Sequence, residues 1–292
     1  MGSFLAASCT APRILPPSSP FPPKSRWEKP LDVPLSAPLA TDGTVVFAAL
    51  SNGSVAAIDP ASGNILWTRT GLKPGFVAAR PSFLVFVEKG GVVWGLNTQD
   101  GSAHWKTTTS VADVHSVRLD GNRIFLGGGS GLAALVVSTG QSRFDLPASE
   151  VRDIDVAGDT LVSIEGGALL VRRREDGVVR FRLASPEGEF AAPAVFADGR
   201  IVVGSGTRLV RAISPSGEFK WRFKVGARVK DRPLDFLDGK RVGVLSFEGV
   251  FYELSPEAAT CVGAPSSPLA RSGHRSWPPA GSGRRSSRTR SR

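Results

Sequence analysis

Short apolar runs separated by turn residues repeat along most of this chain. Between residues 67 and 105, the runs FVAARP (76–81), FLVFVEK (83–89), GVVWGLN (91–97) and AHWKTT (103–108) are divided by Lys-Gly-Gly and Asn-Thr-Gln-Asp-Gly. Short runs rich in Val, Phe and Trp and bounded by Gly, Asn and Asp are typical of β-strands. No helical apolar period is sustained over the length of a helix. The pattern predicts an all-β protein with four strands in each repeat.

A glycine followed four residues later by an aromatic side chain marks each repeat. The aromatics are 38, 39, 37 and 40 residues apart, a period typical of a propeller or a solenoid. Asp-Gly and Asn-Gly turns recur between the runs and suit tight hairpins. Four antiparallel strands in each unit favour a β-propeller blade. The marker pairs are Gly63 and Trp67, Gly101 and Trp105, Gly140 and Phe144, Gly177 and Phe181, and Gly217 and Trp221.

A sixth repeat begins near the C-terminus but loses its marker. Residues 232–254 carry the first three runs, yet Ala259 and Gly263 stand where the glycine and the aromatic are expected. The fourth strand of this blade is therefore missing from the pattern.

Trp27 offers a way to complete that blade. It lies 15 residues before the first turn of its repeat, as Trp105 does in a complete one. We therefore predict six blades over residues 25–256, closed by pairing a strand at Trp27 with the three C-terminal strands, which would remove two exposed sheet edges. A truncated ring of seven or eight blades is the alternative.

The chain is basic because of its C-terminal tail. Residues 262–292 hold seven arginines and no lysine or acid, so the formal net charge of +10 falls to +3 for residues 1–261. The tail, residues 257–292, is rich in Arg, Ser, Pro and Gly without periodicity, and we expect it to be disordered. An arginine-rich arm for nucleic acid or anionic lipid is the alternative to a simple extension. We expect no nucleic-acid partner.

Residues 1–24 have the character of a targeting segment and a tether. FLAAS precedes Cys9, and a Pro/Ser-rich stretch follows it. Small residues before a cysteine and a flexible spacer after it are similar to the end of a bacterial lipoprotein signal, which would make Cys9 a lipid-attachment site. Only eight residues precede Cys9, fewer than a signal needs. An ordinary N-terminus with an incidental cysteine is the alternative. No apolar run is long enough for a transmembrane helix.

The stretches AAIDPASGNILW (56–67), WGLNTQDGSAHW (94–105) and RAISPSGEFKW (211–221) resemble the repeat of the pyrroloquinoline-quinone-type β-propeller family. One branch of this family consists of quinoprotein dehydrogenases, in which adjacent cysteines and a calcium ion hold the quinone. This chain has no adjacent cysteines and no spaced cluster of oxygen ligands. We therefore expect no catalytic residues, no metal site and no cofactor.

The resemblance implies a binding scaffold instead. Non-catalytic members of the family include a lipoprotein of the outer-membrane β-barrel assembly machinery, whose propeller has eight blades. We expect a monomeric, protein-binding propeller in the periplasm or lipid-anchored at the outer membrane, with an envelope assembly complex as its partner. A quinone-dependent dehydrogenase, a generic sensor or adaptor, and a secreted or cytoplasmic location are the alternatives.

One charge run lies inside the predicted propeller. Arg172-Arg173-Arg174 falls on the third strand of the fourth repeat, where alternation would point Arg173 away from its neighbours. A solvated strand with salt bridges to the following turn is one interpretation. A partner-binding patch of Arg173 and Arg152 is the other. The marker aromatics themselves are interpreted as packing residues and not as a ligand site.

Overall fold

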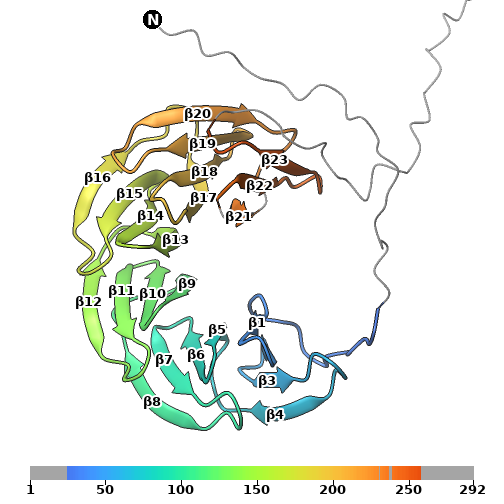
Figure 1. Ribbon diagram of the computed structural model, residues 1–292. Coiled ribbons are helices and arrows are strands. Elements are labelled where there is room, and N and C mark those ends of the chain that lie inside the picture. Colours follow the sequence, from blue (N-terminus) through green and yellow to red (C-terminus); the bar gives the residue numbers. More distant parts are fainter. Residues whose placement is uncertain (1–24, 230, 237–238, 258–292) are drawn as a thin grey trace, which may run out of the picture.

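The computed structural model describes residues 25–229, 231–236 and 239–257, and in this part of the chain every regular element is a β-strand (Figure 1). The 23 strands form five four-stranded sheets and one three-stranded sheet, and all paired strands are antiparallel. The prediction of an all-β propeller built from four-stranded antiparallel blades is confirmed.

Each blade is a meander in which consecutive strands are neighbours. The first three blades are β1 (Ala40–Thr41), β2 (Val46–Ala49), β3 (Val55–Ile58) and β4 (Ile65–Arg69); β5 (Gly75–Arg80), β6 (Phe83–Glu88), β7 (Val92–Leu96) and β8 (Ala103–Thr108); and β9 (Val114–Asp120), β10 (Arg123–Gly128), β11 (Gly131–Val136) and β12 (Ser142–Pro147). The others are β13 (Val151–Ala157), β14 (Thr160–Glu165), β15 (Ala168–Arg173) and β16 (Val179–Leu183); β17 (Phe190–Val195), β18 (Ile201–Ser205), β19 (Leu209–Ile213) and β20 (Phe219–Lys224); and β21 (Leu234–Phe236), β22 (Arg241–Leu245) and β23 (Phe251–Leu254).

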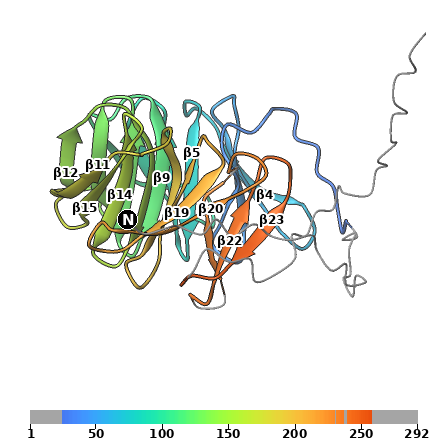
Figure 2. The ribbon, with the colours of Figure 1, turned by 90° about the horizontal axis from the view of Figure 1, so that it is seen from above.

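The six sheets lie side by side on an arc, with the first strand of each blade innermost and the fourth strand outermost (Figure 1). The perpendicular view shows the strands of the third and fourth blades running across the thickness of this arc (Figure 2). The arc therefore has two faces. Face 1 carries the connections between blades and the turns between second and third strands. Face 2 carries the remaining turns.

The core lies between neighbouring sheets. Phe47 of β2 and Phe86 of β6 belong to one buried cluster that joins the first two blades. The middle strands β11, β14 and β18 are buried at every position, because both faces of each sheet are covered by a neighbour. This double burial explains why the middle strands are continuous apolar runs, whereas the outer strands alternate apolar and polar residues.

The marker glycine and aromatic meet across the boundary between blades. The ring of Trp67, on β4, lies against Gly101 of the next repeat, where an added Cβ would come within 2.7 Å of it. Gly101 also has a φ of +70°, so a side chain there is disfavoured twice. The indole N–H of Trp67 donates to Thr98 O at 2.9 Å. Trp105 repeats this arrangement with Gly140 and Val137 O.

A β-bulge on the fourth strand follows each marker turn. In all five complete blades the register between the third and fourth strands shifts just after the residue opposite the aromatic. The opposite residue is small in four of them: Ala57 faces Trp67, Gly95 faces Trp105, Ala134 faces Phe144 and Ala212 faces Trp221, while Val171 faces Phe181. A bulge re-aims the side chains next to it, and a small partner leaves room for the ring.

The predicted closure through Trp27 is wrong. Trp27 lies outside every strand of the described residues, and its ring packs against Gly63 of the first blade while its N–H donates to Pro60 O at 2.9 Å. It therefore makes the contact of a marker aromatic without providing a strand to the C-terminal sheet. The described part of that sheet has the three strands β21 to β23, and the arc is open between it and the first blade (Figure 1).

Candidate functional site

The residues proposed from sequence fall in separate places. Cys9 and the tail lie outside the described residues. Arg152 is near the start of β13, on face 1, where it pairs with Glu150 and Glu189. Arg173 is at the end of β15, on face 2, where it pairs with Asp176 of the next turn. The hypothesis that Arg152 and Arg173 form one patch is wrong, because β13 and β15 bring them to opposite ends of the blade.

The arginine run alternates as the strand pattern predicts. Arg173 is exposed and Arg172 is buried. The guanidinium of Arg172 pairs with the buried Glu165 at 2.7 Å, donates to Gly177 O at 2.9 Å and contacts Ser163 Oγ at 3.3 Å. The expectation of a solvated strand is therefore wrong for Arg172, which forms an ion pair inside the fourth blade, and it describes only Arg173, which pairs with the turn.

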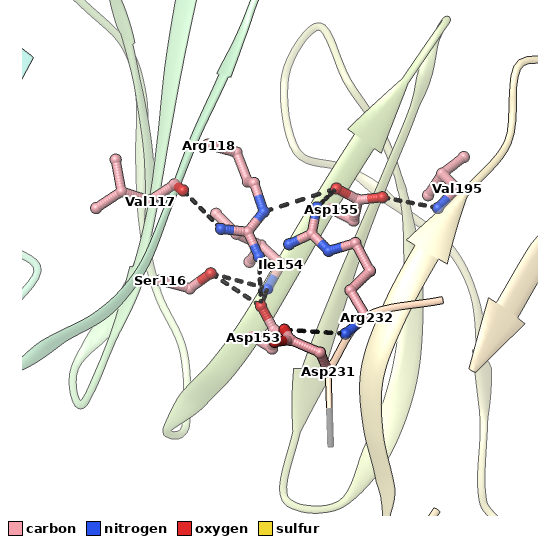
Figure 3. Close-up of polar contacts among 9 residues, drawn as sticks. All are labelled: Ser116, Val117, Arg118, Asp153, Ile154, Asp155, Val195, Asp231 and Arg232. Atoms are coloured by element: carbon pink, nitrogen blue, oxygen red, sulfur yellow. Dashed lines mark hydrogen bonds and ion pairs between the residues drawn. The ribbon is translucent and has the colours of Figure 1, made fainter. Parts of the chain in front are cut away.

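A second group of charges joins the inner strands of neighbouring blades (Figure 3). We name Ser116, Arg118, Asp153, Asp155 and Arg232 the inner-strand cluster. Ser116 Oγ and Arg118 Nη2, both on β9, donate to Asp153 Oδ1 of β13 at 3.0 and 3.2 Å. Arg118 Nε lies 3.7 Å from Asp155 Oδ1. The third and fourth blades are thus linked by charge at their innermost strands.

Asp155 is the centre of this cluster. Its Oδ2 accepts a hydrogen bond of 2.8 Å from the backbone N–H of Val195 on β17, and its Oδ1 pairs with Arg232, two residues before β21. One carboxylate therefore contacts the third, fifth and sixth blades. Burial raises the pKa of Asp155 from its ordinary value of 3.8 to about 6, although the Val195 N–H and Arg118 act in the opposite direction. Burial also raises the pKa of Asp153.

The raised pKa of Asp155 gives a testable pH dependence. Between about pH 4 and pH 6 the folded state holds a proton on Asp155 that the unfolded state has lost, so stability falls as the pH rises through this range. The contribution is at most about 3 kcal/mol, since one pKa unit corresponds to about 1.4 kcal/mol. Urea unfolding at several pH values should show this decline in the wild type and a flatter profile in Asp155→Asn. Parallel profiles would contradict the assignment.

A pocket of about 520 Å³ opens on face 1, at the ends of the strands that carry most of the cluster. Phe76 and Val114 supply apolar surface, and Lys89, His115 and Glu150 supply charged or polar groups. His115 Nε2 lies 3.9 Å from Glu150 Oε1. A concave surface with an apolar base and a few polar groups is typical of a binding site. Asp113 and Gly129 complete the lining.

The arrangement favours binding through charge. The carboxylates of the inner-strand cluster are engaged by guanidinium, hydroxyl and amide groups, yet the side chains of Arg118, Asp153 and Arg232 remain about a quarter exposed. Perturbed carboxylates at a partly exposed position are typical of functional sites. Within the described residues, no three His, Cys, Asp or Glu side chains gather as metal ligands. No helix there could cross a membrane.

Sequence reasoning missed this cluster, although a signal existed. Asp153 and Asp155 are two residues apart in a predicted strand, so their side chains share one face of it. Two acids on one face of an inner strand would have indicated a polar site. Arg232, which lies 77 residues from Asp155, could not have been placed from local pattern.

The fold and the polar inner strands define a β-propeller with a charged, partly exposed centre and a pocket on one face. Residues 21–183 match the family described as outer membrane protein assembly factor BamB, which is more than half of the 292 residues. The chain belongs to this family of quinone-type propeller repeats. The match includes four of the five residues of the inner-strand cluster.

Two curated relatives have low sequence identity to this chain. The chain is 30% identical to the outer membrane protein assembly factor BamB of Xanthomonas campestris over 145 residues, 49% of this chain and 34% of the relative. It is 24% identical to the protein of the same name from Yersinia pestis over 235 residues, 74% of this chain and 50% of the relative. The chain thus spans half or less of the length of these two relatives.

A solved structure supports the fold. The crystal structure of BamB from Moraxella catarrhalis superposes with a TM-score of 0.53 at 14% sequence identity, over 77% of this chain and 86% of that one. At this identity the likeness shows the propeller architecture alone.

Proposed function

We propose that this chain is a non-catalytic, protein-binding propeller of the bacterial cell envelope that acts in the assembly of outer-membrane proteins. The observation that carries the proposal is the family match over residues 21–183, which covers the blades that hold most of the inner-strand cluster. The two curated relatives are named assembly factors of the outer membrane. Lipid attachment at Cys9, with the following residues as a tether, would hold the propeller at the periplasmic side of that membrane.

The partner-binding surface in this proposal is face 1 at the third and fourth blades. There the pocket supplies apolar area, and the inner-strand cluster supplies fixed charges further along the innermost strands of the same blades. Charges held in place by ion pairs lose little entropy when a partner binds, and complementary charge gives specificity. Binding sites on a rigid fold are commonly placed at loops and strand ends of one face.

Affinity purification from the native cell envelope tests this function. The full chain, tagged and expressed in the organism that carries it, should recover components of outer-membrane protein assembly. Arg118→Gln removes one charge of the inner-strand cluster and should lower that recovery by about tenfold, since hydrogen bonds to charged groups contribute about 1.5–3 kcal/mol. Lys220→Gln, an exposed residue on the outer strand β20, is the matched control.

Circular dichroism would verify that both variants fold. Full recovery by a folded Arg118→Gln variant would contradict the proposed surface. Failure of the exported wild-type chain to recover any assembly component would contradict the proposed function itself.

A further inference from the structure

Arg211 is a buried cation without a matching hydrogen-bond acceptor. It lies on β19, is 3% exposed, and neither of its terminal nitrogens makes a hydrogen bond. The nearest charge is Glu187, whose Oε2 lies 3.3 Å from Arg211 Nη2. Burial lowers the pKa of Arg211, which shows how unfavourable the site is for the charge. Burying a guanidinium is costly unless it is paired and hydrogen-bonded.

Arg172 is a buried arginine of this chain whose guanidinium has hydrogen-bond acceptors. It is also almost fully buried, but it reaches Glu165, Ser163 Oγ and Gly177 O with hydrogen bonds. Arg211 has only the contact with Glu187. The difference indicates that the unused donors of Arg211 are available to another group.

Arg222 stands directly opposite Arg211 in the pairing of β19 with β20. Its Nη1 donates to Glu187 Oε1 at 2.9 Å. Glu187 therefore lies between two guanidinium groups, one buried and one about half exposed. Lys224 is opposite Leu209 and follows Arg222 by two residues, so it shares the same face of the strand. Two guanidinium groups thus contact a single carboxylate, and a third cation lies further along the same face.

The side chain of Glu187 has room to rotate, because it lies in an exposed connection. It lies in the connection between β16 and β17 on face 1, and its side chain is 44% exposed. The connection is held by its backbone, since Glu187 O accepts hydrogen bonds from Ser185 Oγ and Thr207 Oγ1. Rotation of the Glu187 side chain would release both arginines from their ion pairs without moving the loop.

We propose that Arg211 and Arg222 form a carboxylate-binding site on face 1, between the fourth and fifth blades, that takes an acidic side chain of a peptide segment in place of Glu187. The current occupant is itself a carboxylate, and paired guanidinium groups match the two oxygens of such a group. Glu187 is then an internal competitor that keeps the site closed until an acidic segment arrives. The site is separate from the inner-strand cluster and does not depend on it.

Fluorescence anisotropy with a labelled hexaglutamate peptide tests the proposal, using the full chain at low ionic strength. Arg222→Gln should weaken binding by about fivefold or more, as expected for loss of a charge-assisted contact. Glu187→Gln should strengthen binding several-fold, because it removes the competitor. Lys220→Gln, on the same strand but paired with Glu218, should bind as the wild type does. The arginine tail is common to all four proteins and cannot produce these differences.

Arg222 is about half exposed, so its variant is expected to fold even if Glu187→Gln is destabilised. Hexaglutamate should also raise the melting temperature of Glu187→Gln more than that of the wild type. Equal affinities for wild type and Arg222→Gln would overturn the proposal. Displacement of the peptide by inorganic phosphate as readily as by free glutamate peptide would also overturn it, since the site would then be a general anion site.

Discussion

Replacing Trp67 with alanine is expected to lower the free energy of unfolding by about 3–5 kcal/mol, the cost typical of removing a packed Trp. The Trp67 ring fills the space against Gly101 of the second blade and lies 6.0 Å from the ring of Phe47. The variant also leaves Thr98 O without its indole donor. The loss should appear in urea unfolding monitored by circular dichroism.

Leu66→Ala is the matched control for this experiment. Leu66 precedes Trp67 on the same strand but is 55% exposed, so its truncation should change stability by no more than about 0.5 kcal/mol. If Trp67→Ala and Leu66→Ala unfolded at the same urea concentration, the role of the marker aromatics in joining blades would be refuted.

Arg172→Met is expected to cost about 3–5 kcal/mol of stability, because it leaves the carboxylate of Glu165 buried without its counter-charge. The two side chains are both less than a tenth exposed and lie 2.7 Å apart. Thermal and urea unfolding would measure the loss. The adjacent Arg173→Met is the control, and it should change stability little because Arg173 and its partner Asp176 are exposed.

The double variant Arg172→Met with Glu165→Leu sharpens this test. Replacing both members of a buried ion pair by apolar residues is often close to neutral, so the double variant should regain most of the lost stability. A double variant as unstable as Arg172→Met alone would show that the effect comes from packing and not from the uncompensated charge.

The repeat could be predicted because it depends on residues that are close together in the sequence. Pairs such as Gly101 and Trp105 recur at a fixed spacing. The glycine is needed for a positive φ in the turn, and the aromatic ring is needed for packing. The spacing does not indicate which strand a segment pairs with. Trp27 keeps the spacing and the contact of a marker, yet its backbone is in no strand of the described residues. Strand pairing depends on distant segments, so the predicted closure failed.

The candidate site was harder to predict for the same reason. Arg118, Asp155 and Arg232 come from three separate repeats and meet only because their strands or strand entrances are innermost. Arg172 was interpreted as solvated because charged runs usually are, but the strand turns it toward Glu165 in the interior. Burial of a single position depends on the neighbouring sheet, which sequence pattern does not specify.

Site-specific photocrosslinking in living cells tests the central claim most directly. A photoreactive residue at His115, in the pocket on face 1, is compared with one at Lys220 on the outer strand β20. If the propeller binds its partner through face 1 of the third and fourth blades, position 115 should give an adduct with a component of outer-membrane protein assembly and position 220 should give none. Adducts from position 220 alone, or equal adducts from both positions, would contradict the account.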